Sequence, residues 1–274
     1  MPVSQPRSRR AASVPWFVAL TLSTACGGSD GGGGGTVVEP TPPARAGAYT
    51  DAELTYFGEI AYGFEYGTAT PVIRKWRSDV RVALIGAPTA EDSATVREVA
   101  GELTALIGGP VRVTLVARDQ PAEVDVHFLP RAQFRTVVAQ STQGDWGQFW
   151  LWWDAADAFT RGIVLMGSDV PPDARRHLIR EELTQALGLA RDSERYPASI
   201  FYQGWSLTTA YTALDRALVE MLYREEVRTG LTEREVTPVL RGLTRRTPAV
   251  AARASRSPGA AAPPGPAVGM AGGH

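Results

Sequence analysis

The segment VRVALIGAPTAEDSATVREVAGELTALIGGPVRVTLVA, residues 80–117, contains the pattern that decides the fold. Apolar side chains alternate along residues 80–86, which predicts a strand with one buried face. Residues 90–107 repeat apolar positions at helical spacing, and the glycine pair that begins at Gly108 ends that helix. A second strand is expected over residues 111–117. Together these elements predict a β-α-β unit, which is typical of α/β proteins.

The sequence around this unit predicts further strands and a helical C-terminal half. Thr50-Asp51-Ala52-Glu53 has the capping-box pattern that begins a helix. We therefore expect an α+β or mixed α/β fold with a mixed sheet and early packing helices. Its length, residues 50–244, fits a single domain. The expected strands are 72–76, 124–129, 146–153 and 162–166, and the expected helices are 50–62, 131–139, 172–189, 208–226 and 232–244.

The N-terminus has the features of a bacterial export signal. Arginines at 7, 9 and 10 precede an apolar run over 11–22, which is too short to cross a bilayer as a helix. Small residues then lead to Cys26, so residues 1–25 resemble a lipoprotein signal cleaved before a lipidated cysteine. Ser23 stands where that pattern usually has leucine, with Leu22 one place earlier. An ordinary secretory signal with a chance cysteine is the alternative.

A flexible tether follows this cysteine. Residues 26–49 are rich in glycine and proline, and such a chain spans roughly 25–30 Å. We expect Cys26 to carry the lipid and to hold the protein at a membrane of the cell envelope. The outer membrane is the better expectation where two exist, because Gly27 replaces the aspartate associated with inner-membrane retention. The other end, residues 245–274, is rich in alanine, proline and glycine and is expected to be disordered, so His274 receives no role.

Composition excludes several classes of function. The formal net charge is −1, but seven of the 28 basic residues lie at the two ends, whereas all 29 acidic residues lie between Asp30 and Glu235. The middle of the chain is therefore acidic, which argues against a nucleic-acid partner. A single cysteine excludes an internal disulfide or a cysteine-rich metal site, and there are only three histidines. Neither a G-x-S-x-G nucleophile elbow nor a phosphate-binding glycine loop occurs in the folded part.

The expected helix 172–189 contains the residues best suited to catalysis or metal binding. Four polar side chains lie along one side of this otherwise apolar helix, at three- and four-residue spacing: His177, Glu181, Glu182 and Gln185. From Glu181 onward the helix resembles the active-site helix of metzincin-type zinc peptidases, H-E-x-x-H-x-x-G-x-x-H. Glu182 and Gly188 match the glutamate and the glycine of that motif. Glu181, Gln185 and Arg191 stand where it has its three zinc-binding histidines.

A second resemblance covers more of the chain. Residues 170–243 are similar to DUF2927, a bacterial family of putative lipoproteins. The matching segments are Glu181 to Leu189, Asp192-Ser193, Ser199-Ile200-Phe201, Leu214 to Tyr223, and Arg228-Thr229-Gly230-Leu231. This resemblance implies a zincin-like α/β core and a location in the cell envelope, and it implies no established activity.

Three interpretations of the helix are open. In the first, the protein is a divergent metal-dependent hydrolase in which Glu182 is the catalytic base. His177 and Glu181 would bind zinc together with a third donor such as Asp192 or Glu194. In the second, the helix is a catalytic site without a metal. In the third, the polar residues make buried hydrogen bonds and ion pairs, for instance to Arg176, Arg180 or Arg191. We expect the third, and hence a binding or scaffolding domain without catalysis and without a metal or cofactor.

An aromatic cluster occupies one expected strand and gives a third hypothesis. Trp150 and Trp152 share one strand face, and the other face carries Phe149, Leu151 and Trp153. Exposed tryptophans, together with Gln185, would suit a cell-wall glycan or peptide, whereas buried ones would be core. If this strand borders the 177–191 helix, it would offer a groove for an extended peptide. His127 is expected to be a partly exposed strand residue.

Overall fold

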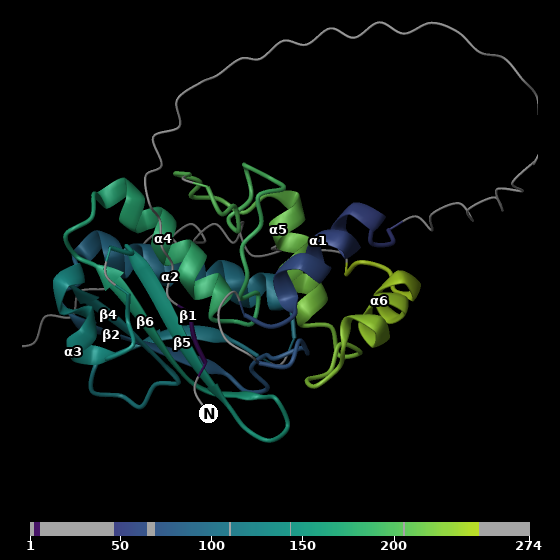
Figure 1. Cartoon of the computed structure of the whole chain (residues 1–274), viewed down its shortest axis with the longest axis horizontal. Helices are drawn as coiled ribbons and strands as arrows, with labels where there is room; N and C mark the ends of the chain where they lie inside the picture. Colours follow the sequence, from purple (N-terminus) through teal and green to yellow (C-terminus); the bar gives the residue numbers. More distant parts are fainter. Residues whose placement is uncertain are drawn as a thin grey trace, which may run out of the picture.

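The computed structural model describes residues 3–5, 47–64, 69–109, 111–142, 144–204 and 206–246. Within them a six-stranded sheet runs in the order β1-β5-β6-β4-β2-β3. Figure 1 shows this sheet with α5, α1 and α6 gathered beyond one end of it. The strands are β1 (Val3–Gln5), β2 (Val80–Gly86), β3 (Val113–Val116), β4 (Val124–Leu129), β5 (Gly147–Trp153) and β6 (Phe159–Gly167). The helices are α1 (Asp51–Ala61), α2 (Ala90–Ile107), the short 3-10 turn η1 (Arg131–Gln133), α3 (Phe134–Val137), α4 (Pro172–Gln185), α5 (Ala213–Leu222) and α6 (Glu233–Gly242).

The predicted β-α-β unit is confirmed. Strands β2 and β3 pair in parallel, and helix α2 connects them over the predicted residues. The Thr89 side chain and the Asp92 side chain cap the helix start reciprocally, which satisfies backbone donors that have no partner inside the helix. At the other end Gly108 adopts the left-handed conformation with φ 54°, where glycine is favoured.

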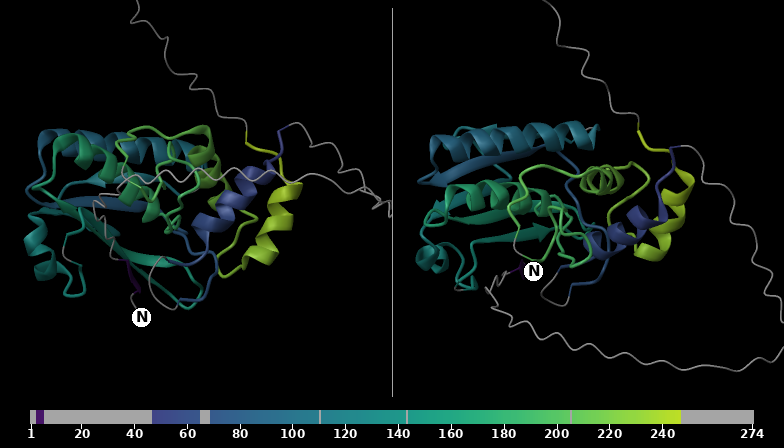
Figure 2. Two further views of the ribbon diagram at one scale, coloured as in Figure 1. Left: turned by 45° about the horizontal axis from the view of Figure 1, so that its top comes forward. Right: turned by 90° about the horizontal axis from the view of Figure 1, so that it is seen from above.

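The sheet is mixed, as predicted. Strands β2, β4 and β6 pair in parallel, whereas β5 pairs with β6 in the antiparallel direction. Strands β5 and β6 thus form a hairpin, and within the described residues the other neighbour of β5 is the short β1. Helices α2 and α4 pack against each other on one face of the sheet (Figure 2), and η1 and α3 lie on the other. The fold class, a mixed sheet with early helices and a helical C-terminal half, is confirmed.

One expected strand is absent, and several expected helices are shorter than predicted. Residues 72–76 form only two isolated bridges, Val72 with Thr232 and Lys75 with Ala158, because they meet loop residues and only the first residue of β6. Helix α4 ends at Gln185 because Gly188 has φ +119°, which no helix allows. Helix α5 begins only at Ala213, where Thr212 and Asp215 form a capping box.

Most of the predicted targeting segment, the tether and the tail lie outside the described residues, and Cys26 lies there too. The exceptions are β1, which falls within the predicted signal 1–25, and residues 47–49 and 245–246 of the expected tether and tail. Among the helices of the described ranges, none has the length and apolarity needed to span a bilayer.

Candidate functional site

Helix α4 is buried on nearly all sides, and its four polar residues are buried with it. His177, Glu181, Glu182 and Gln185 are each at most 1% exposed. Burying so many polar groups is costly unless each has a partner. The contacts of these four side chains therefore decide whether the helix can bind a ligand or only stabilises the fold.

Both ring nitrogens of His177 face oxygen atoms. Its Nδ1 lies 2.6 Å from the carbonyl oxygen of Thr208, and its Nε2 lies 3.3 Å from Glu181 Oε2. A carbonyl oxygen only accepts, so Nδ1 donates to Thr208. The Nε2 contact is within ion-pair distance, but Nε2 has no hydrogen-bond partner among the described residues. The pair is buried beneath the loop that contains Thr208.

Glu182 faces a different neighbour from Glu181. A Cβ built on Gly147 would lie 2.6 Å from Glu182 Oε1, so the carboxylate rests against the backbone where β5 begins. Strand β5 therefore borders this helix, which is the condition on which the peptide-groove hypothesis depends. Glu182 and the His177–Glu181 pair, predicted to share one side of the helix, instead contact separate parts of the fold.

Gln185 holds the loop that follows the helix. Its Nε2 donates to Asp192 Oδ1 at 2.7 Å, while its Oε1 has no hydrogen-bond partner among the described residues. The arginines expected beside these groups bind elsewhere. Arg176 pairs with Glu91, and Arg180 pairs with Glu98 and Glu102 on α2. Arg191 lines a surface pocket.

These donors do not fit a zinc site. A zinc ion held by protein needs at least three ligands, and His177 and Glu181 supply only two. Of the two residues considered as a third donor, Asp192 accepts from Gln185, and Glu194 is exposed on the following loop. Within the described ranges no three His, Cys, Asp or Glu side chains are arranged to hold a metal.

The glycine of the motif has a structural reason to be there. At Gly188 a Cβ would lie only 2.2 Å from the carbonyl oxygen of Arg74. Trp76 Nε1 donates to the carbonyl oxygen of Ala186 at 2.8 Å, so the turn after α4 lies directly on the 72–76 segment. The close approach of two backbones explains glycine at this position.

A buried hydroxyl network, which sequence reasoning missed, fixes the Ser199-Ile200-Phe201 segment. Tyr56 donates to Ser199 Oγ at 2.8 Å, and Ser199 donates to Asp215 Oδ1 at 2.5 Å. Burial raises the pKa of Asp215, and the hydrogen bonds from Ser199 and Thr212 oppose that shift. The capping-box spacing of Thr212 and Asp215 was the available signal, but it does not reveal the distant Tyr56.

The tryptophans of β5 divide between two faces, as predicted. Trp150 is 2% exposed in a small core cluster with Phe134 and Ile163. Trp152 packs at the edge of that cluster, half-buried, with the Arg161 guanidinium 5.5 Å from its ring centroid. A ligand arriving from solvent would therefore meet Trp152 and not Trp150. His127, partly exposed as predicted, has its pKa lowered by burial.

The comparisons with known proteins identify the family. The chain matches the family described as "Protein of unknown function (DUF2927)" over residues 51–242, and it therefore belongs to that family. The match extends well beyond the 170–243 segment that carried the resemblance in the sequence. A search of the curated proteins finds no match.

Two solved structures of myroilysin are similar to parts of the chain. "Structure of myroilysin" has a TM-score of 0.35 and 12% identity, and covers 55% of this chain and 96% of that one. "Crystal structure of myroilysin" has a TM-score of 0.27 and 14% identity, and covers 67% of this chain and 77% of that one.

Proposed function

We propose that this protein is a lipid-anchored component of the cell envelope whose DUF2927 domain binds an extended peptide along β5 without cutting it. The observation that carries this proposal is the pairing of β1 with β5. Residues Val3–Gln5 add to β5 as an antiparallel strand, with Val3 opposite Leu151 and Gln5 opposite Phe149. The edge of β5 thus accepts a short extended segment.

Cleavage of the predicted signal would free this edge. Residues 3–5 belong to the segment 1–25, which we expect to be removed before Cys26. An unpaired edge presents a row of backbone donors and acceptors, which an extended peptide from a partner can occupy. Backbone pairing would supply affinity, and the half-buried Trp152 would supply side-chain contact.

Binding without cleavage agrees with the state of His177. Both of its ring nitrogens already face oxygen atoms of this chain, and its pair with Glu181 is buried. Such a pair stabilises the fold and the loop above it, and within the described residues it belongs to no group of three side chains that could hold a metal.

A backbone-modified peptide tests the pairing. The probe is a synthetic peptide of residues 1–8, added to the chain from residue 26 onward, with Cys26→Ser to prevent oxidation. Alternate N–H groups of an extended strand point to opposite sides. N-methylation of Ser4, or of Val3 and Gln5 together, should therefore weaken binding by about tenfold or more in only one of the two peptides. Tryptophan fluorescence and amide NMR shifts of β5 report the binding.

Absence of saturable binding, or equal binding of both N-methylated peptides, would overturn the proposal. If glycan fragments bind in place of the peptide, and Trp152→Ala abolishes that binding, β5 is a glycan-binding strand.

Peptide hydrolysis is the second candidate, because Glu182 lies against the start of β5, close to where a bound peptide would run. Mass spectrometry of the peptide, incubated with and without added zinc, distinguishes the two functions. Our proposal expects intact peptide. Cleavage that disappears in Glu182→Gln would establish the hydrolase, with Glu182 as the general base.

Lipid anchoring is tested separately at Cys26. We expect the full chain, expressed in a bacterial host, to partition into the membrane fraction and to be released by detergent. Cys26→Ser should yield a soluble protein or an uncleaved precursor, because the acyl chains that supply the anchor are lost. An unchanged membrane fraction in that variant would contradict the lipoprotein assignment.

A further inference from the structure

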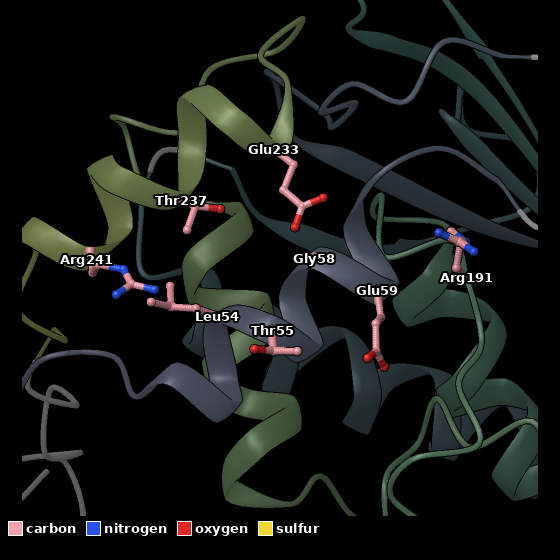
Figure 3. A pocket seen from close by; sticks show the side chains of 8 residues that line it. All are labelled: Leu54, Thr55, Gly58, Glu59, Arg191, Glu233, Thr237 and Arg241. Atoms are coloured by element: carbon pink, nitrogen blue, oxygen red, sulfur yellow. The ribbon is translucent and has the colours of Figure 1, made fainter. Parts of the chain in front are cut away.

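A groove between α1 and α6 lies apart from both α4 and β5. It consists of two hollows of about 350 and 500 Å³. Glu233 and Thr237 of α6 line both hollows, so the two are adjacent. Figure 3 shows the first hollow, with side chains of α1 and α6 facing each other and Arg191 at one side. Volumes of this size are typical of small-molecule sites.

Two of the charged groups in the first hollow are already neutralised. Glu59 accepts from Arg195 and from Ser193, and the hydrogen bond from Arg195 lowers the pKa of Glu59. Arg241 forms an ion pair with Asp51 at 3.1 Å. These groups therefore add no net charge for a ligand to balance.

The other two charged groups are unpaired. Arg191 and Glu233 form neither a hydrogen bond nor an ion pair with any residue in the described ranges, although they line the same hollow. Arg191 comes three residues after the Gly188 turn, which places it outside the buried α4 cluster. A cation and an anion that share a hollow without pairing complement a ligand that carries both charges.

Gly58 shapes the floor of the hollow. It lies inside α1, where glycine lowers helix stability relative to alanine. A Cβ at this position would lie 2.6 Å from Glu233 Oε1. The missing side chain therefore lets the Glu233 carboxylate rest against the helix backbone within the groove.

Tyr62 provides an independent sign of a ligand in the second hollow. The side chain is 5% exposed and lines that hollow, yet its hydroxyl has no hydrogen-bond partner among the described residues. A buried hydroxyl without a partner is rare, and each instance needs an explanation such as a bound molecule.

We propose that this groove binds a short peptide with a free amino and a free carboxyl end. The peptide carboxylate would pair with Arg191 and its ammonium with Glu233. The same ammonium would also donate to the Tyr62 hydroxyl oxygen, because Tyr62 and Glu233 line one hollow. This site is separate from the strand pairing proposed for β5, so each proposal can be correct or wrong without the other.

The dipeptide Ala-Ala is the first probe, titrated into the chain from residue 26 onward and followed by NMR shifts. We expect saturable binding that weakens at least about tenfold when the dipeptide is N-acetylated or C-amidated, since either change removes one charge. Arg191→Gln and Glu233→Gln should each weaken binding similarly. Arg97→Gln, on the exposed side of α2, is the matched control and should leave binding unchanged.

Two further variants separate ligand binding from structural support. Tyr62→Phe removes an unsatisfied hydroxyl, and Gly58→Ala improves the helix but displaces the Glu233 carboxylate. Both should keep or raise the melting temperature of the free protein while weakening Ala-Ala binding several-fold. The proposal is wrong if no saturable binding occurs, if the blocked dipeptides bind equally well, or if Arg191→Gln and Glu233→Gln leave the affinity unchanged.

Discussion

Replacing Gly188 with alanine should lower the free energy of unfolding by roughly 4 kcal/mol, because strain and overpacking add at this position. The backbone has φ +119°, which side chains of L-residues rarely adopt. The new Cβ would also lie 2.2 Å from the Arg74 carbonyl oxygen, and backbone cannot move away as easily as a flexible side chain. Chemical denaturation followed by tryptophan fluorescence measures the change.

Gly101→Ala is the matched control. Gly101 lies inside α2, and a Cβ there would have no neighbouring atom within 4 Å. This substitution should stabilise the protein by about 0.5–1 kcal/mol through helix propensity alone. If Gly188→Ala were as mild as Gly101→Ala, the close contact between the α4 turn and the 72–76 segment would be wrong.

The parts of the fold that the sequence predicted well are those with local causes. Helix α2 and its flanking strands were predicted from apolar spacing and the Gly108 stop, which act within a few residues. The strand predicted over residues 72–76 is absent because the segment meets loop residues near Thr232 and only the first residue of β6, which do not form a ladder beside it. Burial alone could not distinguish these arrangements.

The sequence identified the polar residues of α4 that form the candidate site, but it did not predict which residues they contact. The polar positions of α4 were evident from helical spacing, and all four are buried. Their partners could not be foreseen, because Thr208 and Gly147 lie far from them along the chain. Arginines nearby in sequence were the natural guess, but Arg180 points toward α2. The packing of α4 between the sheet and the loop that contains Thr208 determines which polar groups come into contact.

The ion pair between Arg175 and Asp92 predicts the second large effect. Arg175 Nε lies 2.6 Å from Asp92 Oδ1, and both side chains are less than a tenth exposed. Arg175 also donates to the carbonyl oxygen of Val170 at 3.0 Å. Arg175→Met should destabilise the protein by about 3–5 kcal/mol, because it leaves the Asp92 carboxylate buried without its cation. Urea unfolding of the purified variant measures this.

The neighbouring residue supplies the control for this prediction. Arg176 forms an ion pair with Glu91, but both side chains are about half exposed, at 52% and 50%. Arg176→Met should therefore cost less than about 1 kcal/mol, since water screens the exposed pair. Asp92→Asn keeps an oxygen that can accept from the Thr89 backbone N–H, so combining it with Arg175→Met removes the buried charge without removing the helix cap. The double variant should be more stable than the sum of the single losses predicts, by about 1–3 kcal/mol. Additive losses would mean that the two side chains stabilise the fold separately, and that α2 and α4 are not joined by this pair.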